Sequence, residues 1–128
     1  MGPFKDGWCK EDVEAVLRKG DPSELPYVPI VVSLDPPECQ WAQNVCVRLA
    51  RHPDPAVRGN AILGFGHLAR TCRRLDELIV RPLVESALRD TERYVLGHAI
   101  DAVDDLTHYL GWKFEQLPEK LTSFLARD

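Results

Sequence analysis

The fold is decided by residues 52–70, which read HPDPAVRGNAILGFGHLAR. Pro53 cannot continue a helix, Asp54 is a favoured N-cap residue, and Pro55 suits the first helical position. A helix is therefore expected over about 55–71. Its apolar positions recur at helical spacing and are Val57, Ala61, Ile62, Phe65, Leu68 and Ala69. This stretch predicts a sharp turn followed by an amphipathic helix.

The same pattern occurs a second time later in the chain, and aligning position 57 with position 95 reveals it. After this shift the segments 57–69 and 95–107 share identical residues, which in the second segment are Val95, Gly97, Ala99, Ile100 and Leu106. The preceding helices align as well, since Trp41 falls on Ile79 and Val45 on Leu83. A helix–turn–helix unit used twice, with a period of about 40 residues, is typical of helical solenoids.

Residues 52–70 resemble the second half of a HEAT repeat, in which an Asp-Pro turn is followed by Val-Arg and then by small residues. The positions that carry the resemblance are Asp54, Pro55, Val57, Arg58, Ala61 and Leu68. In the second unit Asp90 and Val95 match, but Leu96 stands in place of the arginine, and Pro82 matches a mid-helix proline common in such repeats. The resemblance implies an all-α fold, a short HEAT-like solenoid of two helical hairpins.

We therefore expect one domain over 1–128, with repeats at 35–74 and 75–111. Two repeats are too few for a stable solenoid, so 1–34 and 112–128 are expected to be terminal caps, with Trp112, Phe114 and Phe124 covering exposed ends. Helices are predicted over 10–19, 35–51, 55–71, 76–88, 92–110 and 118–126. Asp76 is predicted to cap one helix, Asp90 or Thr91 the next, and Gly20 and Gly111 to end theirs. The segment 23–34 fits either a strand or a helix, and a helix is favoured because its neighbours are helical.

The composition fits a soluble domain, with 45% hydrophobic and 28% charged residues. No apolar run is long enough to span a membrane, and the N-terminus lacks a secretory signal, so a cytoplasmic protein is expected. The four cysteines show no metal-ligand spacing, and Cys39 and Cys46 lie too far apart on one helix for a disulfide. The cysteines are interpreted as small buried hydrophobes in a reducing compartment.

The net charge of −4 is unevenly distributed. Residues 35–74 carry 6 basic and 3 acidic groups, whereas residues 75–110 carry 3 basic and 8 acidic groups. An acidic chain is poorly suited to nucleic acid, because phosphate contacts need a cationic face, but it suits a basic partner. The cluster Arg70, Arg73 and Arg74 is interpreted as cations placed near a helix C-terminus.

A polar stripe on the last repeat helix is the main candidate site. His98, Asp101, Asp105 and His108 follow one another at steps of 3, 4 and 3, with Asp104 beside them. The stripe could be a solvated face, a protein-contact surface, a divalent-metal site or an acid/base pair. The shift between the two repeats places Asn60 and His67 beside it, on the side that HEAT-type stacks use for binding. We expect a partner-binding face made of Asn60, His67, His98, Asp101, Asp104, Asp105 and His108, with no catalytic residue, metal or cofactor.

The whole chain also resembles a small HEAT-like family of bacterial immunity proteins, which neutralise the toxins of contact-dependent growth inhibition. This resemblance is carried by residues 57–70 and 88–90 and by Asp101, Asp104, Asp105, Leu110 and Trp112. It implies a non-enzymatic protein whose acidic concave face occludes the basic active site of a cognate toxin domain, commonly a nuclease, without touching nucleic acid or membrane. The alternatives are an enzyme-like HEAT protein, such as a DNA glycosylase or a lyase, and a generic protein-binding scaffold.

Overall fold

The structure, a computed structural model, describes residues 1–115, and within this range the chain is all-helical and has no strand. A 3-10 turn, Gly2–Phe4, precedes six α-helices. The helices are α1 (Lys10–Lys19), α2 (Tyr27–Leu34), α3 (Cys39–Leu49), α4 (Pro55–Cys72), α5 (Glu77–Ala87) and α6 (Arg93–Leu110). The all-α fold class is thus confirmed for this range, while the predicted tail helix and Phe124 lie outside the described residues.

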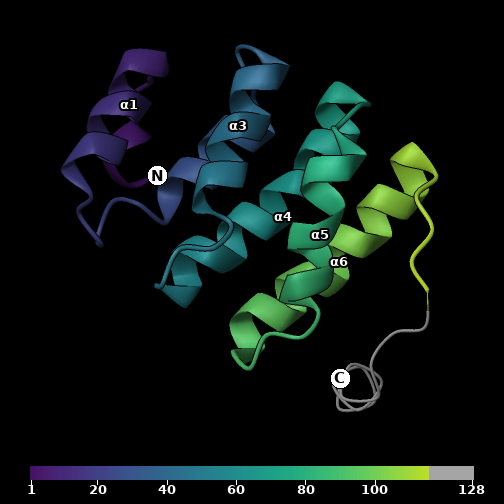
Figure 1. The fold of residues 1–128 in the computed structure, drawn as a ribbon. Helices are drawn as coiled ribbons and strands as arrows, with labels where there is room; N and C mark the ends of the chain where they lie inside the picture. Colours follow the sequence, from purple (N-terminus) through teal and green to yellow (C-terminus); the bar gives the residue numbers. More distant parts are fainter. Residues whose placement is uncertain (116–128) are drawn as a thin grey trace.

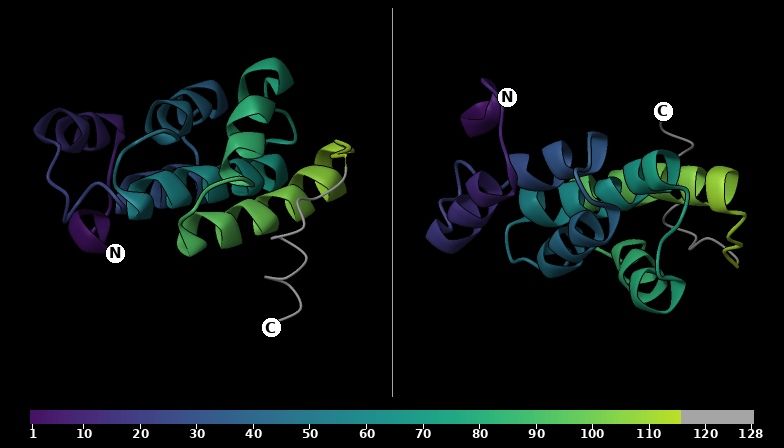
Figure 2. Two further views of the ribbon diagram at one scale, coloured as in Figure 1. Left: turned by 60° about the horizontal axis from the view of Figure 1, so that its bottom comes forward. Right: turned by 90° about the horizontal axis from the view of Figure 1, so that it is seen from above.

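The helices are arranged in two rows (Figures 1 and 2). The helices α1, α3 and α5 follow one another across the molecule in Figure 1, and α4 and α6 run side by side behind them. The central helix α4 packs against α6 most extensively, then against α2 and α3. Consequently α2, α4 and α6 form a continuous row, and α6 is its C-terminal edge.

Helix boundaries agree with the capping signals in most places. The Asp54 carboxylate accepts a hydrogen bond from the Ala56 N–H at 2.9 Å, and Pro55 is the first residue of α4. Gly20 and Gly111 adopt the left-handed conformation that ends α1 and α6. The ambiguous segment 23–34 contains the helix α2, so the preference for a helix there is confirmed.

Two boundary predictions are wrong. Helix α6 begins at Arg93 with Glu92 as its N-cap residue, not with Asp90 or Thr91. The Asp90 carboxylate accepts the Glu92 N–H at 2.9 Å and is held by the Arg58 guanidinium, so it acts just before the helix. Helix α3 begins at Cys39, later than the expected start at 35, and ends at Leu49.

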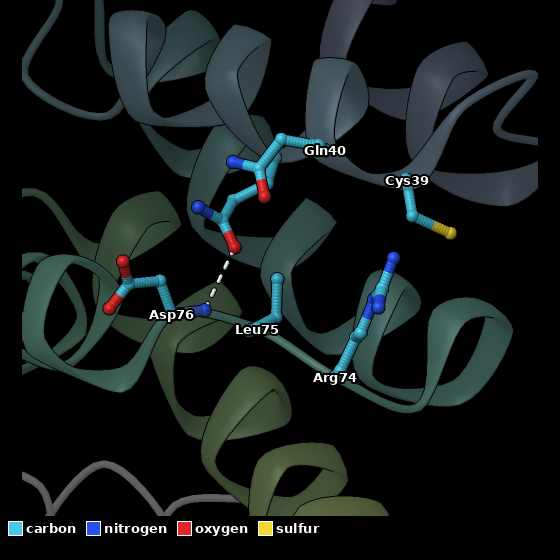
Figure 3. Close-up of a pocket in the computed structure, with 6 residues that line it drawn as sticks. Cys39, Gln40, Arg74, Leu75 and Asp76 are labelled. Atoms are coloured by element: carbon cyan, nitrogen blue, oxygen red, sulfur yellow. Dashed lines mark hydrogen bonds between the residues drawn. The ribbon is translucent and has the colours of Figure 1, made fainter.

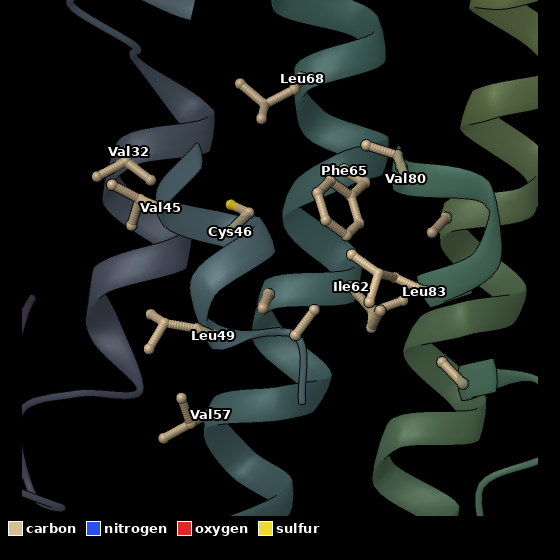
Figure 4. Close-up of a cluster of buried hydrophobic side chains, with 14 of the residues drawn as sticks. Val32, Val45, Cys46, Leu49, Val57, Ile62, Phe65, Leu68, Val80 and Leu83 are labelled. Atoms are coloured by element: carbon tan, nitrogen blue, oxygen red, sulfur yellow. The ribbon is translucent and has the colours of Figure 1, made fainter. Parts of the chain in front are cut away.

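The core is centred on α4, whose side chains Ile62, Phe65 and Leu68 are fully buried between the two rows (Figure 4). Glycine allows α6 to approach closely, because a Cβ at Gly66 would lie only 3.1 Å from the Ala102 Cα. After α6 the Trp112 side chain is buried, and the role of this segment as a terminal cap stays a prediction. The Arg81 guanidinium lies over Trp112 and Phe114, 5.6 Å and 4.7 Å from the ring centres.

The structure corrects the interpretation of the cysteines. Cys39 and Cys72 form a disulfide, with their Cα atoms 6.0 Å apart, which joins the first residue of α3 to the last residue of α4. Cys46 is buried as expected, whereas Cys9 is an exposed thiol. The predicted hairpin places Cys39 and Cys72 near its two open ends, but the sequence pattern does not set how far one helix slides along the other and so does not fix the pairing.

Candidate functional site

The most charged surface of the row lies on α6. We call Asp101, Asp104 and Asp105 the acidic face; Asp101 and Asp104 are exposed and Asp105 is partly exposed. Within residues 1–115 none of these three carboxylates forms an ion pair or a hydrogen bond with a side chain. Three unneutralised carboxylates therefore lie within about one turn of one helix, where Asp104 and Asp105 follow Asp101 at the i+3 and i+4 spacings at which like charges repel.

Asn60 connects the three helices of the row instead of facing a partner. Its side chain is buried, with 4% exposed, and its Nδ2 donates to the Pro26 carbonyl at 2.8 Å. Its Oδ1 accepts from the Tyr94 hydroxyl at 2.5 Å. Both ends of the amide are thus used inside the protein, so Asn60 positions α6 against α4, while its role in partner binding stays a prediction.

His67 lies between α2 and the acidic face. Its Nδ1 is 3.0 Å from the Ser33 hydroxyl oxygen, and burial lowers its pKa, as does Arg70, against the opposing effect of Asp105. Ser33, His67 and Asp105 are the same three residue types as in a hydrolase catalytic triad. However, Ser33 is fully buried and its hydroxyl also reaches the Ile30 carbonyl at 3.2 Å, so the group is a link between helices that no substrate can reach.

The other two histidines flank the acidic face. The His98 ring packs on Tyr94, with the ring centres 4.4 Å apart, and burial lowers its pKa, while Asp101 raises it. His108 is exposed, and its ring lies against Tyr109 at 4.6 Å. The predicted stripe therefore lies on one helix, with His98 at the interface between α6 and α4 and His108 on the solvent side.

Sequence reasoning missed two features outside the stripe. One is a pocket of about 300 Å³ between α3 and the connection from α4 to α5, lined by Cys39, Gln40, Gln43, Arg74, Leu75 and Asp76 (Figure 3). The other is Gln43, a buried amide whose oxygen accepts the Asp76 N–H at 2.9 Å and whose nitrogen has no partner in the described part of the chain. A buried glutamine on a helix gives no distinctive sequence signal.

Within residues 1–115 no three His, Cys, Asp or Glu side chains are arranged to hold a metal ion. No helix in the same range has both the length and the apolar character needed to cross a membrane.

Comparison of the chain with protein-family models, with curated proteins and with solved structures yields no match. The fold and the site define a structural class: within residues 1–115 this is a small all-helical protein in which an acidic helix, α6, forms the edge of a row of helices.

Proposed function

We propose that the chain is an immunity protein, which binds a cognate toxin through the acidic face and thereby covers a basic active site. In this proposal the two helical rows are a short HEAT-like solenoid, and the protein acts in the cytoplasm without catalysis. The observation that carries the proposal is the set of unneutralised carboxylates at Asp101, Asp104 and Asp105.

The energetic argument concerns the free protein. Asp101 and Asp105 are four residues apart on one helix, a spacing at which like charges destabilise by about 0.2–0.5 kcal/mol. Asp104, three residues after Asp101, adds a second like-charge pair at neighbouring positions of α6. A cationic partner offsets both effects on binding and is also attracted from a distance, which speeds association.

The hydrogen bonds that join α2, α4 and α6 support binding by a preformed surface. The links Pro26–Asn60–Tyr94 and Ser33–His67 fix the three helices of the row relative to one another. The acidic face therefore needs no rearrangement to meet its partner, which reduces the entropic cost of association. This property suits an inhibitor that binds through a preformed surface.

The test first asks whether the coding sequence next to that of this chain encodes a toxin domain, which is then produced as a catalytically inactive protein; absence of such a domain counts against the proposal. We expect one-to-one binding that weakens steeply as salt is raised. Asp101→Lys and Asp105→Lys should each weaken the affinity by about 100-fold or more, the loss that follows reversal of a charge in contact with a cationic partner. Asp6→Lys is the matched control, because it makes the same change of charge at an exposed position on the N-terminal segment.

The proposal is wrong if the Asp101→Lys and Asp105→Lys variants bind and neutralise the toxin as well as the unchanged protein does. A scaffold with a different basic partner would instead show charge-dependent binding to that partner and no protection against the toxin.

A further inference from the structure

We propose that the Cys39–Cys72 disulfide is a reversible redox latch, which opens by exchange with a low-molecular-weight thiol and then releases the connection between α4 and α5. This inference is independent of the proposed function, since the latch lies on α3 and at the end of α4 while the acidic face lies on α6.

Within residues 1–115 the disulfide and one hydrogen bond hold this connection against α3. The first tether is the bond from Cys39, at the start of α3, to Cys72, at the end of α4. The second is the hydrogen bond from the Asp76 N–H to the Gln43 side-chain oxygen, one turn further along α3. The segment between them, residues 73–75, therefore has a fixed point at each end.

This connection carries features that oppose its closed position. Arg73 has a positive φ of 59°, which is uncommon for a residue other than glycine. The Gln43 nitrogen is buried beneath the connection without a partner in the described part of the chain. Release of the connection would hydrate the Gln43 nitrogen. The Arg73 side chain acts in the opposite direction, since it donates to the Arg70 carbonyl at 3.1 Å and lies 5.0 Å from the Tyr109 ring centre. The covalent tether therefore adds to non-covalent contacts of opposing sign.

The surroundings of the disulfide suit exchange chemistry. Cys39 and Cys72 are both partly exposed, so a small thiol can reach them. Arg70, Arg73 and Arg74 surround the end of α4, and the Arg74 side chain points toward Cys39 (Figure 3). A neighbouring cation stabilises a thiolate, and a thiol of lower pKa is the better leaving group in exchange.

The reaction balances with a thiol such as glutathione as the reductant. Its thiolate attacks Sγ of Cys72, the S–S bond breaks, and the electron pair leaves on Sγ of Cys39, next to Arg74. A second glutathione thiolate attacks the mixed disulfide and displaces Cys72. The products are two protein thiols and one oxidised glutathione, with two electrons and two protons transferred to the protein.

The test equilibrates the full chain in mixtures of reduced and oxidised glutathione, then alkylates the thiols and counts them by mass spectrometry. A Cys9→Ser background removes the exposed thiol and keeps a good N-cap residue for α1. We expect oxidised and reduced forms to interconvert across the series while the helical circular dichroism is retained. A disulfide that survives excess reduced glutathione, or a chain that unfolds when reduced, overturns the latch.

Two variants test the mechanism. In a Cys39→Ser/Cys72→Ser chain the amides of Ile79 and Val80, which bond to the Asp76 carbonyl, should exchange with solvent about tenfold faster, while that of Phe65 is unchanged. If hydrogen exchange speeds up equally at all of these amides, or if this variant fails to fold, the disulfide is a structural cross-link and the proposal is overturned.

A second variant tests the role of Arg74 in the exchange. Arg74→Gln should slow reduction of the disulfide severalfold, whereas Arg89→Gln, at another exposed position, should leave the rate unchanged. Equal rates for the two variants would refute the role of Arg74.

Discussion

Replacement of Arg58 by methionine tests how the turns of neighbouring helical hairpins are held together. The Arg58 guanidinium donates two hydrogen bonds to the Asp90 carboxylate, at 2.8 Å and 3.0 Å. It also donates to the carbonyls of His52 and Pro53, both at 3.0 Å. The Asp90 hydrogen bond raises the pKa of Arg58 further above its usual range, so the guanidinium stays charged at every accessible pH.

The expected loss of stability follows from the burial of the pair. The side chains of Arg58 and Asp90 are only 19% and 15% exposed. Removal of one partner from a fully buried pair costs about 3–5 kcal/mol, and the remaining exposure reduces this to about 2–4 kcal/mol. Methionine keeps the length of the apolar stem, so the change reports mainly on the guanidinium. For a chain of this size the melting temperature should fall by about 10 °C.

Urea denaturation of Arg58→Met, Asp90→Asn and the double variant measures the coupling between the two residues. We expect a coupling free energy of about 2 kcal/mol, near the upper part of the range for residues in one network. Asparagine is chosen because it can still accept the Glu92 N–H. A loss below about 1 kcal/mol for Arg58→Met would show that the pair contributes no more than an exposed ion pair.

Three further predictions concern packing, pH and the surface. Gly66→Ala should lower the free energy of unfolding by about 1 kcal/mol in denaturation experiments. The reason is that steric crowding of the added Cβ against Ala102 on α6 outweighs the gain in helix propensity. A variant more stable than the unchanged protein would contradict this close approach. The pKa values of His67 and His98 are lowered in the folded protein, so the unfolded chain binds more protons below about pH 6.5. The contribution of these residues to stability is therefore complete above that pH and falls as the pH is lowered through it. A flat stability profile in urea titrations between about pH 7.5 and pH 5.5 would refute this. Leu78, which is 89% exposed on α5, should tolerate serine with a change within about 0.5 kcal/mol in the same assay, and a larger loss would reveal a hidden contact.

The helices could be predicted from the sequence because their signals are local. Asp54 and Pro55 begin α4, and Gly20 and Gly111 end α1 and α6, each through contacts within one turn of the chain. The acidic stripe could be predicted for the same reason, since its members lie on a single helix and helical spacing alone places them together.

The contacts between helices could not be predicted, because they depend on how far one helix slides along the next. The internal repeat in the sequence pairs Asn60 with His98. In the structure Asn60 bonds to Tyr94, one turn earlier on α6. Likewise the pairing of Cys39 with Cys72 depends on the crossing of α3 and α4, for which the apolar pattern sets the buried face but not the axial offset.

If the acidic face is maintained for binding, it should cost the free protein stability. Asp101 is exposed, has no ion-pair partner in residues 1–115, and lies four residues before Asp105 on α6. Asp101→Asn should therefore stabilise the free chain by about 0.5 kcal/mol, because it removes two like-charge pairs, one with Asp104 and one with Asp105.

The measurement is urea denaturation at low and high salt, since screening should reduce the gain. Asp6→Asn, at an exposed position in the N-terminal segment, is the control and should change little. A destabilised Asp101→Asn variant would mean that this carboxylate has a structural partner, and the acidic face would then need no ligand to explain it. A stabilised variant that also binds its partner more weakly would show that the carboxylate serves binding at the expense of folding.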